Sequence, residues 1–159
     1  MNITILAVGK LKEGYWQEAV REYAKRLQSY CTLQITEVRE SPLPANPSRS
    51  NEQDVRDQEG LALLSRIKNG DYVIALQIEG RSLSSTELAA RMQQLAIDGR
   101  SSIVFVIGGS LGLSEAVDRR ADLRLSFSAM TFPHQMMRVI LLEQIYRSFK
   151  IIRGETYHK

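Results

Sequence analysis

Cysteine and histidine are scarce in this sequence of 159 residues. Cys31 is the only cysteine, and His134 and His158 are the only histidines. A single cysteine excludes an intramolecular disulfide and a cluster of thiolate metal ligands. Because the two histidines are also far apart in the chain, we predict that the protein has no metal site.

Long apolar runs and a leader segment are also absent. No window approaches the ~20 apolar residues of a membrane-spanning helix. The start MNITILAVGKLKEGYW has no basic region before its apolar run and no small-residue cleavage site. We therefore expect a cytoplasmic protein without membrane association. The length and the charged fraction of 25% are typical of a single globular domain, expected over residues 1–159.

Proline is concentrated in one segment. Three of the four prolines lie close together in the stretch ESPLPANPSRSN. Helices and strands do not tolerate that density, so we predict a flexible loop over residues 41–50. Two Ser-x-x-Glu/Gln spacings predict capping boxes at helix starts, Ser50 with Gln53 and Ser84 with Glu87. Two Asx-Gly pairs predict helix ends, Asn69-Gly70 and Asp98-Gly99.

Apolar periodicity predicts strands and helices that alternate along the whole chain. The expected strands are short apolar or alternating runs, at residues 2–8, 31–35, 72–78, 102–107 and 123–127. Helices are expected between them, and a last long helix should begin near Pro133. Continuous apolar runs such as SIVFVI are typical of buried parallel strands, whereas the alternation in 31–35 indicates an edge strand. This order predicts an α/β domain with a mostly parallel sheet and helices on both faces.

The segment VFVIGGSLGLSEAV connects a predicted strand to a short helix through three glycines. Gly108, Gly109 and Gly112 do not have the i, i+2, i+5 spacing of the dinucleotide fingerprint, and no Lys-Ser or Lys-Thr follows as in a phosphate loop. The turn also follows the fourth strand, whereas dinucleotide folds place the pyrophosphate turn after the first. Either the backbone approaches a ligand closely here, or this is a tight turn without a ligand. The spacing alone does not decide between these interpretations.

A second informative loop follows the last predicted strand, in LRLSFSAMTFPHQMMRVILLEQIYRSF. Ligands of open α/β sheets bind beyond the carboxyl ends of the strands, so this loop and the glycine turn could face one crevice. Phe127, Met130 and Phe132 would supply an apolar slot, and Ser128 and Thr131 would add hydroxyl groups. Such a slot suits a flat heterocycle with polar edges, which indicates a nucleoside-like ligand.

The charge and the apolar surface of the C-terminal end indicate two kinds of binding partner, a polyanion and a second subunit. The net charge is +3, with a local sum of 3 − 6 = −3 over residues 37–59 and of 5 − 2 = +3 over residues 130–159. The basic end is where a polyanion would bind, although a solvated helix face gives the same pattern. The last helix is apolar over more than one face, which predicts burial against the core and against a second subunit. We therefore expect a symmetric homodimer.

Three longer motifs resemble those of one known family. FVIGGSLGL, LSFSAMTFPHQMMRVILLEQIYRSFKI and the terminal RGETYHK are similar to segments of the RlmH family of SPOUT methyltransferases, and the similarity extends over the whole chain. The resemblance implies a fold with a C-terminal trefoil knot and a homodimer that binds S-adenosylmethionine. It also implies methylation of N3 of a pseudouridine in 23S rRNA, on the assembled ribosome.

The family's cofactor contacts fall on two glycines and on residues around two strand ends. By position these residues are Leu76, Gly108, Gly109, Phe127, Ser128, Ala129, Met130, Thr131 and Phe132. His134 and Arg138 follow on the last helix as possible supports of the site, and we expect His134 to be a neutral hydrogen-bonding or capping residue. In this interpretation the glycine pair lies against the cofactor.

The resemblance also draws attention to the terminal segment 153–159. His158 could accept the proton of the target imide, Arg153 could hold a phosphate or the developing anion, and Tyr157 could stack on a base. Composition alone indicates a frayed tail. If the tail is functional, it could complete the site of the neighbouring subunit. Two other functions remain open, namely another nucleotide-dependent α/β enzyme such as a dehydrogenase, and a non-catalytic ribosome- or RNA-binding module.

Overall fold

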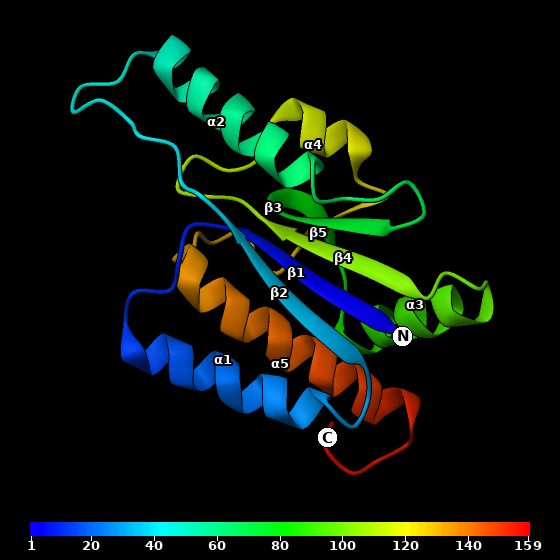
Figure 1. Cartoon of the computed structure of the whole chain (residues 1–159). Helices are drawn as coiled ribbons and strands as arrows, with labels where there is room; N and C mark the ends of the chain where they lie inside the picture. Colours follow the sequence, from blue (N-terminus) through cyan, green and yellow to red (C-terminus); the bar gives the residue numbers. More distant parts are fainter.

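The computed structural model describes all residues, 1–159, with five strands and five helices in alternation (Figure 1). The strands are β1 (Asn2–Val8), β2 (Thr32–Val38), β3 (Tyr72–Ser82), β4 (Ser102–Ile107) and β5 (Leu123–Ser126). The helices are α1 (Gly14–Leu27), α2 (Arg49–Leu64), α3 (Ser85–Ile97), α4 (Glu115–Arg120) and α5 (His134–Ile152). The alternation predicted from apolar periodicity is confirmed. None of the helices combines the length and apolarity that crossing a bilayer requires.

The strands form one sheet in the order β2-β1-β4-β3-β5, and every pairing is parallel. β2 lies at an edge, as its alternating sequence predicts, and the apolar strand β4 lies in the middle of the sheet. The predicted mostly parallel sheet is therefore confirmed. In such a sheet all carboxyl ends lie at the same edge, where the connecting loops can form a binding site.

Two apolar cores lie on opposite faces of this sheet. Helices α1, α3 and α5 pack on one face, and α2 and α4 pack on the other (Figure 1). Along β1, Ile3 and Ile5 point to the first core, while Leu6 and Val8 point to the second. Each fully buried side chain of this kind contributes about 1.5–3 kcal/mol. Burial on both faces explains why the inner strands have continuous apolar sequences.

Helix ends agree with the capping signals in α3 but not in α2. Ser84 and Glu87 form the predicted capping box of α3, and Gly99 follows that helix with a φ of +76°. The capping box of α2 is formed by Ser48 with Asn51, two residues before the predicted pair Ser50 and Gln53. α2 also ends at Leu64, so Asn69-Gly70 is not its stop and belongs to a later turn. The proline-rich loop predicted over residues 41–50 contains no helix or strand up to residue 48, but its last two residues, Arg49 and Ser50, already belong to α2.

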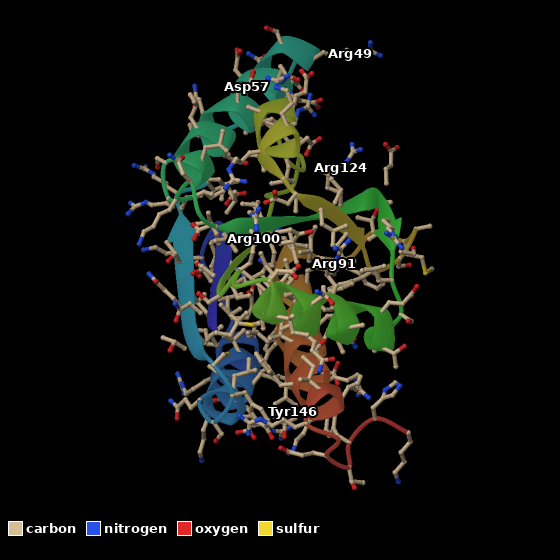
Figure 2. The ribbon with its side chains drawn as sticks, turned by 90° about the vertical axis from the view of Figure 1, so that its right-hand side faces the viewer. Arg49, Asp57, Arg91, Arg100, Arg124 and Tyr146 are labelled. Carbon is tan, nitrogen blue, oxygen red and sulfur yellow. The ribbon has the colours of Figure 1, made fainter.

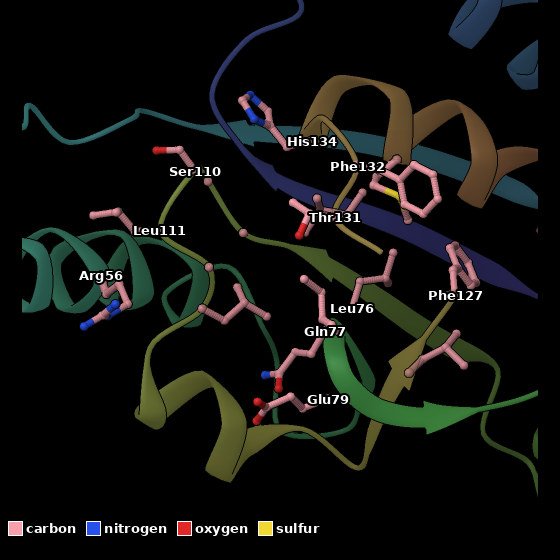
Figure 3. A pocket seen from close by; sticks show the side chains of 18 of the residues that line it. Arg56, Leu76, Gln77, Glu79, Ser110, Leu111, Phe127, Thr131, Phe132 and His134 are labelled. Carbon is pink, nitrogen blue, oxygen red and sulfur yellow. The ribbon is translucent and has the colours of Figure 1, made fainter. Parts of the chain in front are cut away.

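β3 and β5 are paired in an unusual way. Leu125 of β5 is paired both with Leu76 and with Arg81 of β3, and residues 77–80 lie between these two partners. A Cβ atom added to Gly80 would lie 2.8 Å from backbone atoms of Arg124 and Leu125. The far part of β3 bends and crosses the end of β5 (Figure 3). The sequence gives no sign of this crossing, which leaves residues 77–80 free to face the loops beyond the sheet.

Candidate active site

A cavity of about 1160 Å³ lies beyond the carboxyl ends of β3, β4 and β5 (Figure 3). The glycine turn after β4 and the loop after β5 face each other across it, as predicted. β3 lies between these two strands in the sheet, so its residues 76–79 also line the cavity. Side chains from the middle of α2 and from α4 complete the wall on one side.

Most of the predicted cofactor-binding residues line this cavity. They are Leu76, Gly108, Gly109, Phe127, Ser128, Met130, Thr131 and Phe132. Ala129 is not among the lining residues. Met130 has 72% of its surface exposed, so the loop after β5 forms an open wall that a ligand could cover. The Ser128 hydroxyl accepts a hydrogen bond from the Met130 N–H at 3.0 Å and thereby shapes the loop.

Close contacts within the protein restrict both adjacent glycines, and the restriction is stricter at Gly108. A Cβ on Gly108 would lie 2.8 Å from the backbone of Gly112, and a Cβ on Gly109 would lie 3.0 Å from a carboxylate oxygen of Glu59. Gly112 has a φ of +81°, which favours glycine. The closely approaching groups are therefore parts of the protein, so the need for glycine has an internal explanation. Both residues nevertheless face the cavity, and contact with a ligand stays a prediction.

Glu59 is a buried acid for which the sequence predicts no role in a site. It lies in α2 with only 3% of its surface exposed, beneath the glycine turn. Its carboxylate accepts a hydrogen bond from the Ser41 N–H at 2.9 Å. Burial raises the pKa of Glu59, against the effect of the Ser41 hydrogen bond. A signal was present, because Glu59 lies four residues from both Val55 and Leu63 and therefore on an apolar helix face.

His134 is the first residue of α5 and lines the cavity. Burial, followed by the positive charge of Arg138, lowers the pKa of its imidazole, although Glu40 and Glu13 act in the opposite direction. The side chain is consequently neutral near pH 7, as expected from its position at a helix N-terminus.

Arg138 does not line the cavity, but it holds in place the start of α5, which does. Its side chain has 1% of its surface exposed, and it donates to the carbonyl oxygens of Val8 and Gly9 at 3.2 and 2.5 Å. It also forms an ion pair with Glu37 of β2. These bonds fasten the first turns of α5 to the ends of β1 and β2, because a buried guanidinium requires such partners. Arg138 therefore supports the site from behind.

The C-terminal tail is packed against α5. The Tyr157 hydroxyl donates to Glu143 at 3.2 Å, and its ring meets the Tyr146 ring edge-on with centroids 5.0 Å apart. His158 Nδ1 lies 3.3 Å from an Arg147 guanidinium nitrogen. Burial, followed by the Glu143 charge, raises the pKa of the Tyr157 hydroxyl. The tail thus has a defined conformation.

This tail lies at the opposite end of the molecule from the cavity. Arg153 donates to the Ser29 carbonyl at 3.1 Å, in the turn that precedes β2. α5 begins at the cavity and has 19 residues, which corresponds to a length of roughly 28 Å. Figure 2 shows Tyr146 at the end of the molecule opposite to Arg49 of α2. Within one chain the structure does not bring Arg153, Tyr157 and His158 to the cavity.

Comparison with known proteins shows to which family this chain belongs. A family model described as "Predicted SPOUT methyltransferase" matches residues 1–158. A protein of Alkaliphilus oremlandii named "Ribosomal RNA large subunit methyltransferase H" is 56% identical over 159 residues, the full length of both chains. A protein of the same name from Clostridioides difficile is 55% identical over the same length. The chain belongs to the RlmH family of SPOUT methyltransferases.

Membership in this family confirms the resemblance read from the motifs, and it means that the protein is a methyltransferase that needs a methyl donor. A crystal structure of a "Probable Methyltransferase" from Bordetella pertussis Tohama I has a similar fold, with a TM-score of 0.56 at 13% identity. The match covers 92% of this chain and 95% of the other. The structure contains no group of three or more His, Cys, Asp or Glu side chains that could hold a metal ion.

Proposed function

We propose that this protein transfers the methyl group of S-adenosylmethionine to N3 of a pseudouridine in 23S rRNA, on the assembled ribosome. The full-length identity of 56% to a protein named for large-subunit ribosomal RNA methylation carries the proposal. A ribosomal substrate implies a cytoplasmic protein. The small size of the chain leaves few residues for reading RNA sequence, so recognition would depend on the shape of the assembled ribosome.

The cavity fits the proposed donor. Its volume of about 1160 Å³ is slightly above the usual range for small-molecule sites and accommodates a nucleoside with an amino-acid chain. Leu76, Phe127 and Phe132 provide apolar surface for an adenine ring, and Ser128 and Thr131 lie in the same wall. The donor supplies an electrophilic methyl group, and the residues of the cavity hold it in line with the acceptor.

The crossing of β3 and β5 supports the proposed trefoil knot. Leu125 is paired with residues on both sides of the 77–80 bend, and Gly80 lies directly against the β5 backbone. The chain after β5 continues into the cavity loop and α5, which are the segments that the knot would thread. Both cores use the same sheet, which supports a single SPOUT domain over residues 1–159.

The imide N3–H must lose its proton before or during methyl transfer, which requires a base or a stabilising positive charge. We assign these roles to the tail, with His158 as the proton acceptor, Arg153 as the anion or phosphate ligand and Tyr157 as a stacking platform. Because the tail of one chain is far from its own cavity, we infer that it completes the cavity of the second subunit in a homodimer.

Two measurements test the proposed function. Calorimetric titration should show binding of S-adenosylmethionine and none of NAD, whereas binding of NAD alone would favour a dehydrogenase. Incubation with labelled S-adenosylmethionine and ribosomes from a strain lacking the gene should label 23S rRNA at one pseudouridine, as located by mass spectrometry. A protein that binds ribosomes but leaves no label would be a binding module, and the proposal would be wrong.

A further inference from the structure

We call the side of the cavity at Phe127 and Phe132 its apolar part, and the side with Arg56 and Glu79, where Leu111 also lies, its charged part (Figure 3). Phe127 and Phe132 lie at one side, near the start of α5. Arg56 of α2 and Glu79 of the 77–80 bend lie away from them, beside the glycine turn and α4. A nucleoside needs only the apolar part, so the charged part is available for another portion of the ligand.

The charged part contains three ions without a partner of opposite charge, namely Arg56, Glu79 and Asp118. Glu115 is paired with Arg119 at 2.8 Å, and Asp118 accepts a hydrogen bond from the Gln77 amide. Like Asp118, Arg56 has a hydrogen bond only to a neutral side chain, that of Gln53, at 3.0 Å. Glu79 is a member of none of the side-chain hydrogen bonds or ion pairs of the protein. Arg56 is therefore the one cation of this part, and Glu79 is the one anion there without a side-chain hydrogen bond or ion pair within the protein.

We propose that Arg56 and Glu79 form the subsite for the amino-acid end of the methyl donor, with Arg56 binding the α-carboxylate and Glu79 the α-ammonium group. The inference rests on the proposed function, since it takes S-adenosylmethionine as the donor. A free guanidinium and a free carboxylate in one cavity match the two charges of a zwitterion. Arginine is suited to this role because its planar fork binds carboxylates through two parallel hydrogen bonds.

The bend that carries Glu79 is held in place by a neighbouring pair. A carboxylate can only accept hydrogen bonds, so the NH₂ group of Gln77 must be the end that faces Asp118. This contact ties residues 77–80 to α4, and the crossing over β5 fixes the other end of the bend. Glu79 is consequently presented to the cavity by a segment that is anchored on both sides.

The test compares ligands that differ only at the amino-acid end, by calorimetry with the intact protein. Methylthioadenosine lacks that end, and decarboxylated S-adenosylmethionine lacks only the carboxylate. Arg56→Gln should weaken S-adenosylmethionine by about tenfold to a hundredfold, the usual effect of losing a charged hydrogen bond, and leave the other two ligands unchanged. Glu79→Gln should weaken both ammonium-bearing ligands and leave methylthioadenosine unchanged.

Arg49→Gln is the matched control, because Arg49 lies on the same helix and points into solvent away from the cavity (Figure 2). It should leave all three affinities unchanged. Equal losses for methylthioadenosine in the Arg56 and Glu79 variants, or no loss for S-adenosylmethionine, would overturn the subsite. If Arg56→Gln instead weakens only ribosome binding, Arg56 contacts an RNA phosphate and the inference is wrong. Failure of the wild-type protein to bind any of these ligands would contradict the proposed function itself.

Discussion

Glu59 is a carboxylate on an apolar helix face, and its only hydrogen bond in the structure comes from the Ser41 N–H. It connects the loop after β2 to the underside of the glycine turn. An ionised carboxylate is costly in this place, since burial raises its pKa above the usual value of 4.5. The residue therefore shapes the site at the expense of stability at neutral pH.

Glu59→Gln should reduce this cost, because glutamine stays neutral and keeps an oxygen for the Ser41 N–H. A raised folded-state pKa means that the folded protein holds its proton more tightly than the unfolded chain. The free energy of unfolding therefore falls as pH rises from about 4.5 through the folded pKa. Urea denaturation should show the variant more stable than wild type at pH 7, by on the order of 1 kcal/mol, and this advantage should shrink at pH 4.

Glu18→Gln controls for the change in net charge, since Glu18 is exposed on α1 and outside the site. An advantage of Glu59→Gln that is equal at the two pH values would show that the ionisation of Glu59 is not its cause. A large loss of stability at pH 7 would show that the ionised carboxylate stabilises the turn.

At the scale of elements, the strands and most helix starts could be predicted, but their contacts across the chain could not. Ser84 with Glu87 caps α3 as the spacing indicates, because such a cap depends only on neighbouring residues. The same rule misplaced the start of α2, where Asn51 performs the role usually taken by Glu or Gln. The end of α2 was also missed, because its last turns finish through backbone hydrogen bonds of Arg66 and Ile67 without a glycine.

The candidate site shows the same division between local and distant contacts. The two loops that follow β4 and β5 could be predicted as walls of one crevice, because parallel strands end at one edge. Arg56, Glu59 and Glu79 were missed, since their places depend on how α2 packs over the sheet and on how β3 crosses β5. Neither arrangement has a periodic or local sequence signal.

The crossing of β3 over β5 predicts a sharp difference between two glycines. Gly80→Ala should destabilise the fold by about 3 kcal/mol or more, because its Cβ would overlap backbone atoms that cannot rotate away. Gly70→Ala is the matched control, since nothing lies within 4 Å of the added Cβ. Thermal and urea denaturation of both variants measure the difference. Similar stabilities would mean that β3 and β5 do not approach as closely as described.

At the scale of the whole molecule, α5 connects the cavity with the C-terminal tail at the opposite end. Its first turn forms part of the cavity, and its last turn supports the tail with Arg153, Tyr157 and His158. Much of its wide apolar surface is covered by α1 and α3 of the same chain, so that surface alone does not require a second subunit. The stronger argument for a dimer is geometric. A two-fold axis that brings two α5 helices together antiparallel would place each tail near the partner's cavity.

Mixed dimers test whether the tail acts across the subunit interface. Met130→Arg should block the cavity without loss of folding, because Met130 is 72% exposed and the added cation repels a sulfonium. His158→Ala should remove the proton acceptor and leave donor affinity unchanged. Each variant alone should be inactive, but a coexpressed equal mixture should recover about a quarter of wild-type methyl transfer. Random pairing of equal amounts makes half of the dimers mixed. Each mixed dimer has one complete site and one defective site, so a quarter of all sites are active. Sedimentation must show dimers in all samples; no recovery in dimeric mixtures would place the tail's action within its own chain.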